Sequence, residues 1–348
     1  MNYSNFKDPL GLLGRILRSK DKTAYFVLFR EALTIILTPL DLLLQLFEKN
    51  TLKNATENSL PIILILGGSR NGTTLLYQTI VQYLPVSYFS NLIASFPRAP
   101  ITAYRLFGKL FQRPKRNFKS YYGSVTGLAG PSDAFSIWNR WLGKDRNNAP
   151  NQIGKQQQAE MKHFFHAWHR IVNMPLVNKN NRNSLCVPLL DTMFKNIFFI
   201  EIHRNPVYVA QSLVLSRMAI QGNKTTGWGL LSKDSESATD KYAYIDDVCH
   251  QVYEVDKVLE QARNNVDSTK YIRVNYENFC RDPKRVVQDI SQKVLGQTCA
   301  SKDLESLIFD IDSNQQRLAD EEFGRILRGI ENLYGKFSST NNMIADDL

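Results

Sequence analysis

Residues 60–84, LPIILILGGSRNGTTLLYQTIVQYL, decide the fold of this 348-residue chain. The run Leu60–Leu66 is apolar, short and rich in isoleucine, which is typical of a strand buried on both faces of a parallel sheet. A glycine-containing loop follows at once, and the apolar spacing of Thr74–Tyr83 predicts a helix. A strand, a loop and a helix in this order are the unit from which α/β folds are built.

The same unit recurs twice further along the chain. Asn196–His203 and Tyr271–Tyr276 have the character of buried strands, and Pro206 and Pro283 begin the helices that follow them. Three such units, separated by helical insertions, predict an α/β fold with a P-loop-type central parallel sheet flanked by helices. We expect an N-terminal helical extension ahead of this sheet.

The chain is expected to divide into three segments. Residues 1–57 form an N-terminal amphipathic helical segment, residues 58–337 form the main domain, and residues 338–348 form a flexible polar tail. The polar stretch Glu48–Ser59 is expected to connect the N-terminal helices to the main domain.

The N-terminal stretch Ala24–Phe47 is rich in Leu, Ile and Phe, but Arg30, Glu31 and Asp41 interrupt it. It therefore lacks the roughly 20 apolar residues that a membrane span requires. It fits either a pair of amphipathic helices packed on the main domain or an interfacial membrane anchor. No secretory signal is recognised, and we expect a cytoplasmic protein, which an anchor would place at the inner face of a membrane.

Cysteine and histidine spacing gives no sign of a metal site. The four cysteines are far apart, form no CxxC pair and read as buried free thiols, which fits a reducing compartment. They are Cys186, Cys249, Cys280 and Cys299. His163, His166 and His169 are spaced so that they spread around a helix, and the aromatic residues between them favour packing over metal binding.

The positive charge of the chain is concentrated in one stretch. The net charge is +10 and the pI is about 9.3, which indicates an anionic partner. From Asn58 to Ser132 the chain has no acidic residue, and its basic residues there are Arg70, Arg98, Arg105, Lys109, Arg113, Lys115, Arg116 and Lys119. The run Lys109–Lys119 fits either a solvated basic face or an anion-binding segment. No nucleic-acid-binding signature is present, so we expect no nucleic-acid partner.

The loop GGSRNGTT resembles a Walker A sequence without its lysine. Gly67 and Gly72 occupy the glycine positions and Thr74 the hydroxyl position, but Thr73 stands where the phosphate-binding lysine belongs. A kinase or NTPase would lose its contact to the β- and γ-phosphates. The backbone N–H groups of such a loop, at a helix N-terminus, can still cradle one compact anion, and Arg70 can supply the missing cation.

The longer stretch LGGSRNGTTLL closely resembles the 5′-phosphosulfate loop of sulfotransferases that use 3′-phosphoadenosine 5′-phosphosulfate (PAPS). It is most similar to the protein-tyrosine and related bacterial branches, which have arginine where cytosolic members have lysine. Asn71 stands where serine is usual. The resemblance implies that the donor is bound by Gly68, Ser69, Arg70, Asn71, Gly72, Thr73 and Thr74.

Two further segments resemble the same family, so that the resemblance covers roughly Pro61–Gly296. FFIEIHRNPVYVAQSLVLSR resembles its 3′-phosphate element, which implies that Arg204 and Ser212 hold that phosphate. A residue at a strand end and one two turns along the next helix can contact the same anion. IRVNYENF resembles its third segment, with Tyr276 as a candidate nucleotide contact and Glu277 as a structural residue.

The candidate catalytic groups also follow from this resemblance. PLVNKNNRN is similar to the Asn-Lys-Asp-Pro segment of the tyrosine-sulfating branch and implies that Lys179 lies near the transferring group, although a lysine in a solvated loop would explain it equally. Asp133, the first acid after the acid-free stretch, is the candidate general base; otherwise it is a helix N-cap or an acid in the first turn of a helix. The tyrosine-sulfating branch has a glutamate base near the position of Asn91, which cannot act as one.

The resemblance therefore implies a PAPS-dependent sulfotransferase. Such an enzyme transfers a sulfuryl group to an acceptor hydroxyl, leaves 3′-phosphoadenosine 5′-phosphate (PAP), and needs no metal. The acceptor would be a glycan, a glycolipid or a peptide, and the motifs do not choose among them. The alternatives are a P-loop kinase or NTPase-like enzyme and a non-catalytic protein that binds anionic glycans.

Overall fold

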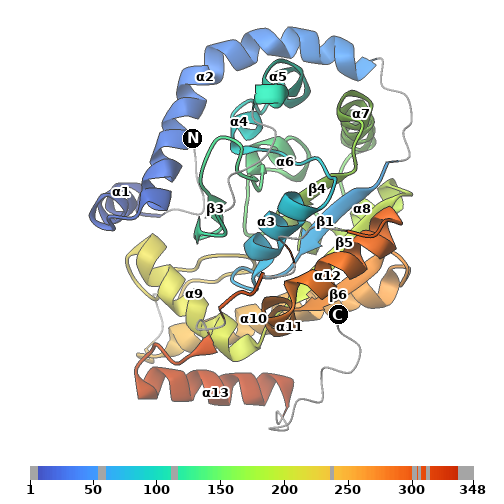
Figure 1. The fold of residues 1–348 in the computed structure, drawn as a ribbon. Coiled ribbons are helices and arrows are strands. Elements are labelled where there is room, and N and C mark those ends of the chain that lie inside the picture. Colours follow the sequence, from blue (N-terminus) through green and yellow to red (C-terminus); the bar gives the residue numbers. More distant parts are fainter. Residues whose placement is uncertain are drawn as a thin grey trace.

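A four-stranded parallel sheet lies at the centre of the computed structural model, which describes residues 7–53, 60–110, 117–235, 239–299, 304, 307–310 and 314–335. In spatial order, its strands are β4 (Leu176–Lys179), β1 (Ile62–Leu66), β5 (Ile197–His203) and β6 (Tyr271–Asn275) (Figure 1). Ile62 pairs with Leu176 on one side and with Ile197 on the other. The predicted α/β fold with a central parallel sheet flanked by helices is confirmed.

Strand β1 is buried on both faces because alternate residues enter two different cores. Ile63 and Ile65 pack with α3 (Thr73–Tyr83) and α12 (Pro283–Ile290), whereas Leu64 lies in the cluster formed by the other face. That second cluster includes residues of α6 (Phe135–Leu142), α7 (Lys155–Val172) and α8 (Val187–Met193). An uninterrupted apolar sequence is the consequence of this double burial.

The remaining elements surround these layers. On the N-terminal side they are α1 (Pro9–Arg18), α2 (Lys22–Lys53), α4 (Asn91–Ala94), α5 (Pro100–Phe107) and the 3₁₀ turn η1 (Gly108–Leu110). A short hairpin, β2 (Ser120–Tyr121) and β3 (Ser124–Val125), precedes α6, and the 3₁₀ turn η2 (Asn181–Leu185) follows β4. On the C-terminal side they are α9 (Pro206–Gln221), α10 (Ala243–Asn265), α11 (Tyr276–Arg281), the π-helical turn η3 (Ser291–Leu295) and α13 (Asp320–Tyr334).

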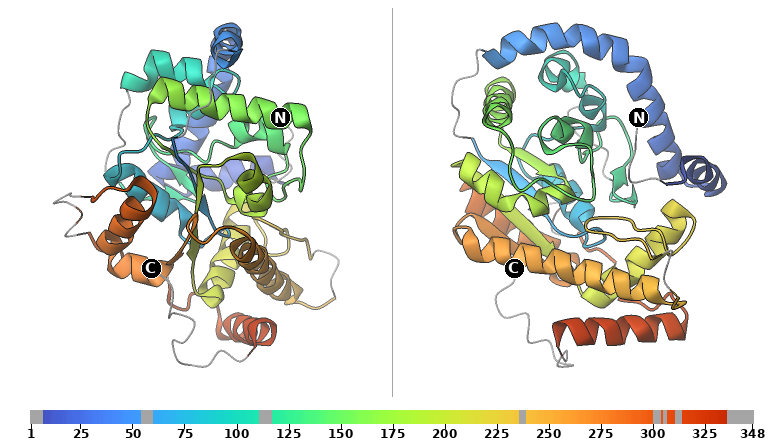
Figure 2. Two further views of the ribbon diagram at one scale, coloured as in Figure 1. Left: turned by 90° about the vertical axis from the view of Figure 1, so that its right-hand side faces the viewer. Right: turned by 180° about the vertical axis from the view of Figure 1, so that it is seen from behind.

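Helices α9, α10 and α13 form a third core at the end of the molecule opposite α2 (Figure 2). Val209 and Leu213 of α9, Val248 of α10 and Ile326 of α13 are among its buried residues. Helix α1 docks against α9, where Arg15 donates hydrogen bonds to the carbonyl oxygens of two residues near the helix C-terminus. A cation at that position satisfies carbonyls that have no partner within the helix.

Helix α2 is longer and more firmly attached than the sequence indicates. It is one 32-residue helix that continues through Pro39, and it extends to Lys53, so that the start of the expected polar connection Glu48–Ser59 is helical. The boundary expected after residue 57, the tail 338–348 and the basic residues Arg113, Lys115 and Arg116 lie outside the described residues. Among the described helices, none combines the length and the apolar character needed to cross a membrane.

Two carboxylates fix α2 to the N-terminus of α5. Asp41 accepts hydrogen bonds from the backbone N–H groups of Arg98 and Ala99, and Glu48 accepts them from those of Ile101 and Thr102. Asp41 and Glu48 are 0% and 1% exposed. The first N–H groups of a helix lack partners within it, so these carboxylates satisfy donors that would otherwise be buried unpaired.

Three of the four cysteines are buried free thiols, as expected, and Cys299 is half-buried. Burial raises the pKa of the Cys186 and Cys249 thiols to about 12 and that of Cys280 to about 11. These thiols therefore stay protonated and unreactive at neutral pH.

Candidate functional site

The glycine loop lies at the point where the order of the strands in the sheet reverses. From β1 the chain goes on to β4 on one side, and the next strand, β5, lies on the other side of β1. In an open parallel sheet a crevice forms at the carboxyl ends of the strands at such a point. The segments after β1, β4 and β5 meet there, and they contain the residues that the sequence singled out.

The backbone of the loop leaves N–H donors available at its helix. Gly67 donates its N–H to Ser184 Oγ over 2.9 Å, which secures the start of the loop. Gly72 has φ 96°, and a Cβ there would lie 2.3 Å from Cδ2 of Tyr276, so both its conformation and its neighbour require glycine. Helix α3 begins at Thr73 with no side-chain cap, so its first N–H groups can bind an anion.

Side chains link the loop to the segments after β4 and β5. Thr73, in the place of the Walker lysine, donates from Oγ1 to Asn181 Oδ1 over 3.3 Å, and Asn181 donates to Ser69 Oγ over 3.5 Å. Asn71 donates to the carbonyl oxygen of Ile202 over 3.4 Å. Asn71, which stands where serine is usual, therefore still makes a polar contact, and its partner is strand β5.

A second cluster joins the loop to the predicted 3′-phosphate element. Arg70 Nε donates to Ser212 Oγ over 2.9 Å, and Arg204 donates to the carbonyl oxygen of Arg70 over 3.1 Å. The Arg204 guanidinium lies 4.7 Å from the centre of the Tyr276 ring. Four residues predicted from three separate motifs are thus brought into contact.

The two arginines of this cluster stand in a region of excess positive charge. Burial lowers the pKa of Arg70 and of Arg204, and the nearby Arg317 lowers both further. Arg204 also donates to Asn314 Oδ1, whose amide group donates to Glu277 Oε1 over 2.8 Å. Glu277 is thus a structural partner, as expected, and an anion between the arginines would relieve their mutual repulsion.

The two candidate catalytic residues form an ion pair with each other. Lys179 Nζ donates to both carboxylate oxygens of Asp133, over 2.9 and 2.8 Å. Their side chains are 3% and 22% exposed. Lys179 ends strand β4 and does not lie in a solvated loop, and Ala134, not Asp133, is the N-cap of α6.

The β2–β3 hairpin covers both clusters, a role that the sequence analysis missed. Its two-residue turn has positive φ at Tyr122 and Gly123, which is typical of a tight hairpin. The Arg70 guanidinium lies 5.3 Å from the centre of the Tyr122 ring. A Cβ at Gly123 would lie 3.5 Å from Lys179 Nζ and 3.7 Å from Thr74 Oγ1. In the sequence, the pair Tyr122-Gly123 within the acid-free stretch is the signal that could have predicted this turn.

Asn91 holds this hairpin in place. It is 0% exposed and its amide group donates to the carbonyl oxygens of Val125 and Gly127 over 2.9 and 2.8 Å. Arg30 of α2 lies on its other side, with a long hydrogen bond of 3.4 Å to Asn91 Oδ1. Asn91, whose amide cannot act as a base, therefore has a structural role.

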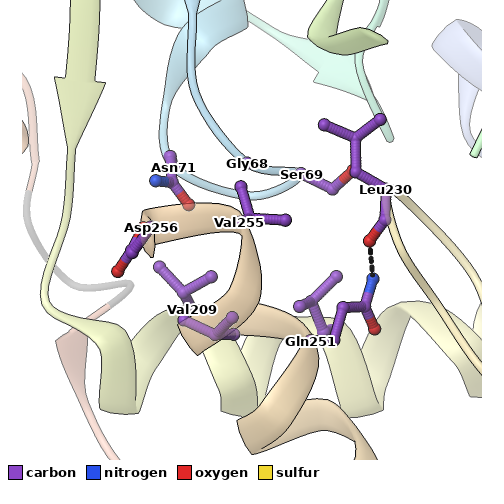
Figure 3. Close-up of a pocket in the computed structure, with 10 residues that line it drawn as sticks. Gly68, Ser69, Asn71, Val209, Leu230, Gln251, Val255 and Asp256 are labelled. Atoms are coloured by element: carbon purple, nitrogen blue, oxygen red, sulfur yellow. Dashed lines mark hydrogen bonds between the residues drawn. The ribbon is translucent and has the colours of Figure 1, made fainter. Parts of the chain in front are cut away.

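A small cavity separates the loop from α9 and α10 (Figure 3). Its polar lining comes from Ser69, Asn71, Gln251 and Asp256, and its walls are otherwise formed mainly by valine and leucine side chains. Burial raises the pKa of Asp256 to about 7.

Comparison with known proteins identifies the chain. A sequence model described as "Sulfotransferase family" matches residues 61–294. The chain belongs to the sulfotransferase family. A search of curated protein sequences found no match. Among solved structures, the sulfotransferase STF1 from Mycobacterium tuberculosis H37Rv has a TM-score of 0.53 at 13% identity, covering 93% of this chain and 91% of that chain. The sulfotransferase STF9 from Mycobacterium avium has a TM-score of 0.49 at 16% identity, covering 82% and 77%.

Membership of the family defines the general chemistry of this sulfotransferase. Its family implies a sulfate-donor nucleotide and a hydroxyl-bearing acceptor. The uncapped N-terminus of α3 and the paired arginines are chemically suited to the anionic ends of such a nucleotide. The sulfotransferase is built as an α/β enzyme of the P-loop type, and the kinase alternative, which required a Walker lysine, gives way to this assignment.

Of the three spaced histidines of this sulfotransferase, His163 is exposed, His166 is half-buried and only His169 is buried. His169 is 1% exposed, and its burial lowers its pKa to about 4. Within the described parts of the chain, no group of three or more His, Cys, Asp or Glu side chains is placed to hold a metal ion.

Proposed function

We propose that this sulfotransferase uses PAPS as its donor and transfers the sulfuryl group to a hydroxyl of a glycan or of a lipid-linked sugar. The observation that carries the proposal is the contact of Arg70 with Ser212 and of Arg204 with Arg70, which unites the loop with the second motif. A donor with phosphates at both its 5′ and 3′ ends accounts for two adjoining cationic sites.

The described residues fit the two ends of such a donor. The N–H groups at the start of α3, together with Thr73 and Thr74, would hold the 5′ end. Arg204 and Ser212 would hold the 3′-phosphate, for which Arg204 would exchange its bonds to Asn314 for charge-assisted ones. The Tyr276 ring, which packs against Gly72 and Arg204, would then border the nucleotide.

The Lys179–Asp133 pair is suited to the transfer step. When bound, PAPS would supply a sulfuryl group joined to a phosphate, and the electron pair of the breaking bond would pass to the departing phosphate oxygen, where negative charge grows. Lys179, which lies near Thr74 beneath the hairpin, can turn from Asp133 toward that charge, and Arg70 can neutralise the departing phosphate oxygen. Asp133 is then left to accept the proton of the acceptor hydroxyl.

The hairpin supports the choice of a sugar-like acceptor. Tyr122 lies 6.1 Å from Trp228, measured between ring centres, and Tyr121 lies 4.8 Å from Tyr122. These rings stand next to the turn that covers Lys179 and Thr74. Aromatic faces beside a cationic site offer apolar surface to an acceptor while its hydroxyl approaches Asp133.

Ligand-induced stabilisation tests the assignment of the donor. PAP at about 100 times its Kd should stabilise the protein by about 2.7 kcal/mol without Mg²⁺. At about 2.1 cal/mol/K per residue, the unfolding entropy of a chain of this length is about 0.7 kcal/mol/K, which converts this into a rise in Tm of about 4 °C. AMP, which lacks the 3′-phosphate, should stabilise much less.

Two serine variants of α9 sharpen this test. Ser212→Ala should weaken the binding of PAP and leave the binding of AMP unchanged. Ser216→Ala is the matched control, because its hydroxyl bonds only to the backbone oxygen of Ser212 in the described structure. Equal stabilisation by AMP and PAP would show that the second motif does not bind a phosphate. Incubation of radiolabelled PAPS with fractionated lipids and polysaccharides would then identify the acceptor; label in neither fraction would refute the proposed acceptor class.

A further inference from the structure

The outer surface of α2 exposes an apolar stripe. Phe29, Ile36, Leu43 and Phe47 are 51%, 71%, 55% and 59% exposed. Their intervals of seven and four residues place them on one side of a helix. Helix α2 lies at the outer edge of the molecule (Figure 1).

The stripe continues onto the neighbouring elements. Leu10 of α1 is 81% exposed, and Leu106 of α5 and Leu110 of η1 are 55% and 71% exposed. Helix α2 packs on α5 through Asp41 and Glu48, and α1 directly precedes α2, so these leucines lie on elements that adjoin α2. We call these apolar side chains of α1, α2, α5 and η1 the α1–α2 face. Many exposed apolar side chains on adjoining elements are typical of an interaction site.

The acidic residues of α2 do not weaken this surface, because the protein itself uses them. Asp41 and Glu48, which interrupt the apolar sequence, point inward to α5. Glu31 is paired with Arg30. The side of the helix that faces outward is therefore more apolar than the linear sequence indicates.

Basic side chains surround the α1–α2 face. Arg105 and Lys109 are exposed beside Leu106 and Leu110, and Lys49 and Lys53 are exposed at the end of α2. Further exposed basic residues lie between α1 and α2: Arg18, Lys20 and Lys22. The exposed acids of these elements are Asp8, which pairs with Arg15, and Asp21, which accepts a hydrogen bond from the Thr23 N–H.

We propose that the α1–α2 face binds the surface of an anionic lipid bilayer as a peripheral, interfacial attachment. An apolar stripe bordered by cations suits a layer of acyl chains beneath negative headgroups. A second copy of the chain on the same face would instead bring two basic borders together, which is unfavourable. The proposal concerns attachment and does not depend on the donor or the acceptor of the enzyme.

Vesicle sedimentation of the full chain tests the proposal. The protein should sediment with vesicles of phosphatidylcholine containing about one third phosphatidylglycerol, more weakly with phosphatidylcholine alone, and should be released by alkaline carbonate. Ile36→Glu/Leu43→Glu should lower the partition coefficient about 100-fold or more. Arg105→Ala/Lys109→Ala should lower the partition coefficient about 30-fold, and only with anionic vesicles. This value follows from about 1 kcal/mol for each basic residue near an anionic surface.

Leu327→Glu is the matched control. Leu327 is 45% exposed on α13, at the opposite end of the molecule from α2, and its replacement should leave sedimentation unchanged (Figure 2). Light scattering and circular dichroism would show that the variants stay folded. Equal sedimentation of the wild type and the Ile36→Glu/Leu43→Glu variant would overturn the proposal. A dimer of the free protein that this variant abolishes would assign the face to a second copy instead, and retention after carbonate would overturn an interfacial position.

Discussion

Replacement of Lys179 by Met tests the ion pair at the centre of the candidate site. The change removes the ammonium group and keeps most of the apolar stem, so that Asp133 loses both hydrogen bonds from Nζ. Removing one partner of a buried pair costs about 3–5 kcal/mol. Because the Asp133 side chain is 22% exposed, we expect a cost at the lower end of this range, about 3 kcal/mol. With an unfolding entropy of about 0.7 kcal/mol/K, Tm should fall by about 4 °C.

The same change should lower turnover with little effect on product binding. Loss of one preorganised cation typically costs about 10²–10³ in rate. PAP lacks the transferring group, so its affinity, measured by calorimetry, should change little. Lys155→Met, an exposed lysine at the start of α7, is the control and should alter stability by no more than about 0.5 kcal/mol.

A double-mutant cycle with Asp133→Asn separates the pair from its surroundings. Each single variant leaves one partner without its counterpart, whereas Lys179→Met/Asp133→Asn removes both charges. Urea unfolding should therefore show the double variant at least about 2 kcal/mol more stable than the sum of the single effects. Additive effects would refute the energetic role of the pair, and near-normal turnover of Lys179→Met would refute its catalytic role. If Lys179→Met does not fold, Lys179→Gln, which removes the charge and keeps a polar side chain, allows the same comparison.

Two further predictions concern Arg70 and His169. Arg70→Ala should lower turnover about 10²–10³-fold and weaken PAP binding less. Arg70→Lys should keep partial activity, because a point charge replaces a forked contact. Normal turnover of Arg70→Ala would contradict the proposed role of the loop. His169 stays neutral in the fold with its pKa lowered to about 4, so protonation of the unfolded chain below pH 6.5 lowers stability as the pH falls. From pH 7 to pH 5 this histidine contributes a loss of about 2 kcal/mol. His169→Gln should reduce the pH dependence measured by urea unfolding, and an unchanged slope would contradict the assignment.

The sequence predicted the strand–helix units in which apolar runs are long and uninterrupted. It did not predict β4, because only two of its four residues are apolar. Asn178 is buried there through hydrogen bonds with Trp138 and Ser132, and Lys179 through Asp133. Tertiary partners make these polar residues compatible with a central strand, and hydropathy alone contains no information about such partners.

The site was predicted where motifs are local and missed where distant segments supply the contacts. The loop residues and Arg204 stand in short patterns with a physical reason for their spacing. Tyr122 and Asn314 come from segments without such patterns, and their contacts to Arg70 and Arg204 depend on how the chain packs. Nor did the sequence indicate that Lys179 and Asp133, which are 46 residues apart, would neutralise each other.

The carboxylates of α2 have a consequence for any attempt to shorten the protein. A truncated form that began after Lys53 would lack Asp41 and Glu48, and the N–H groups of Ala99, Ile101 and Thr102 would lose their acceptors. The truncation would also expose the apolar surface that Leu44 covers, so the catalytic body would be destabilised when the apolar helix is removed. Solubility would have to be improved by substitution on the outer surface of α2, since the helix that exposes the leucines also completes the core beneath them.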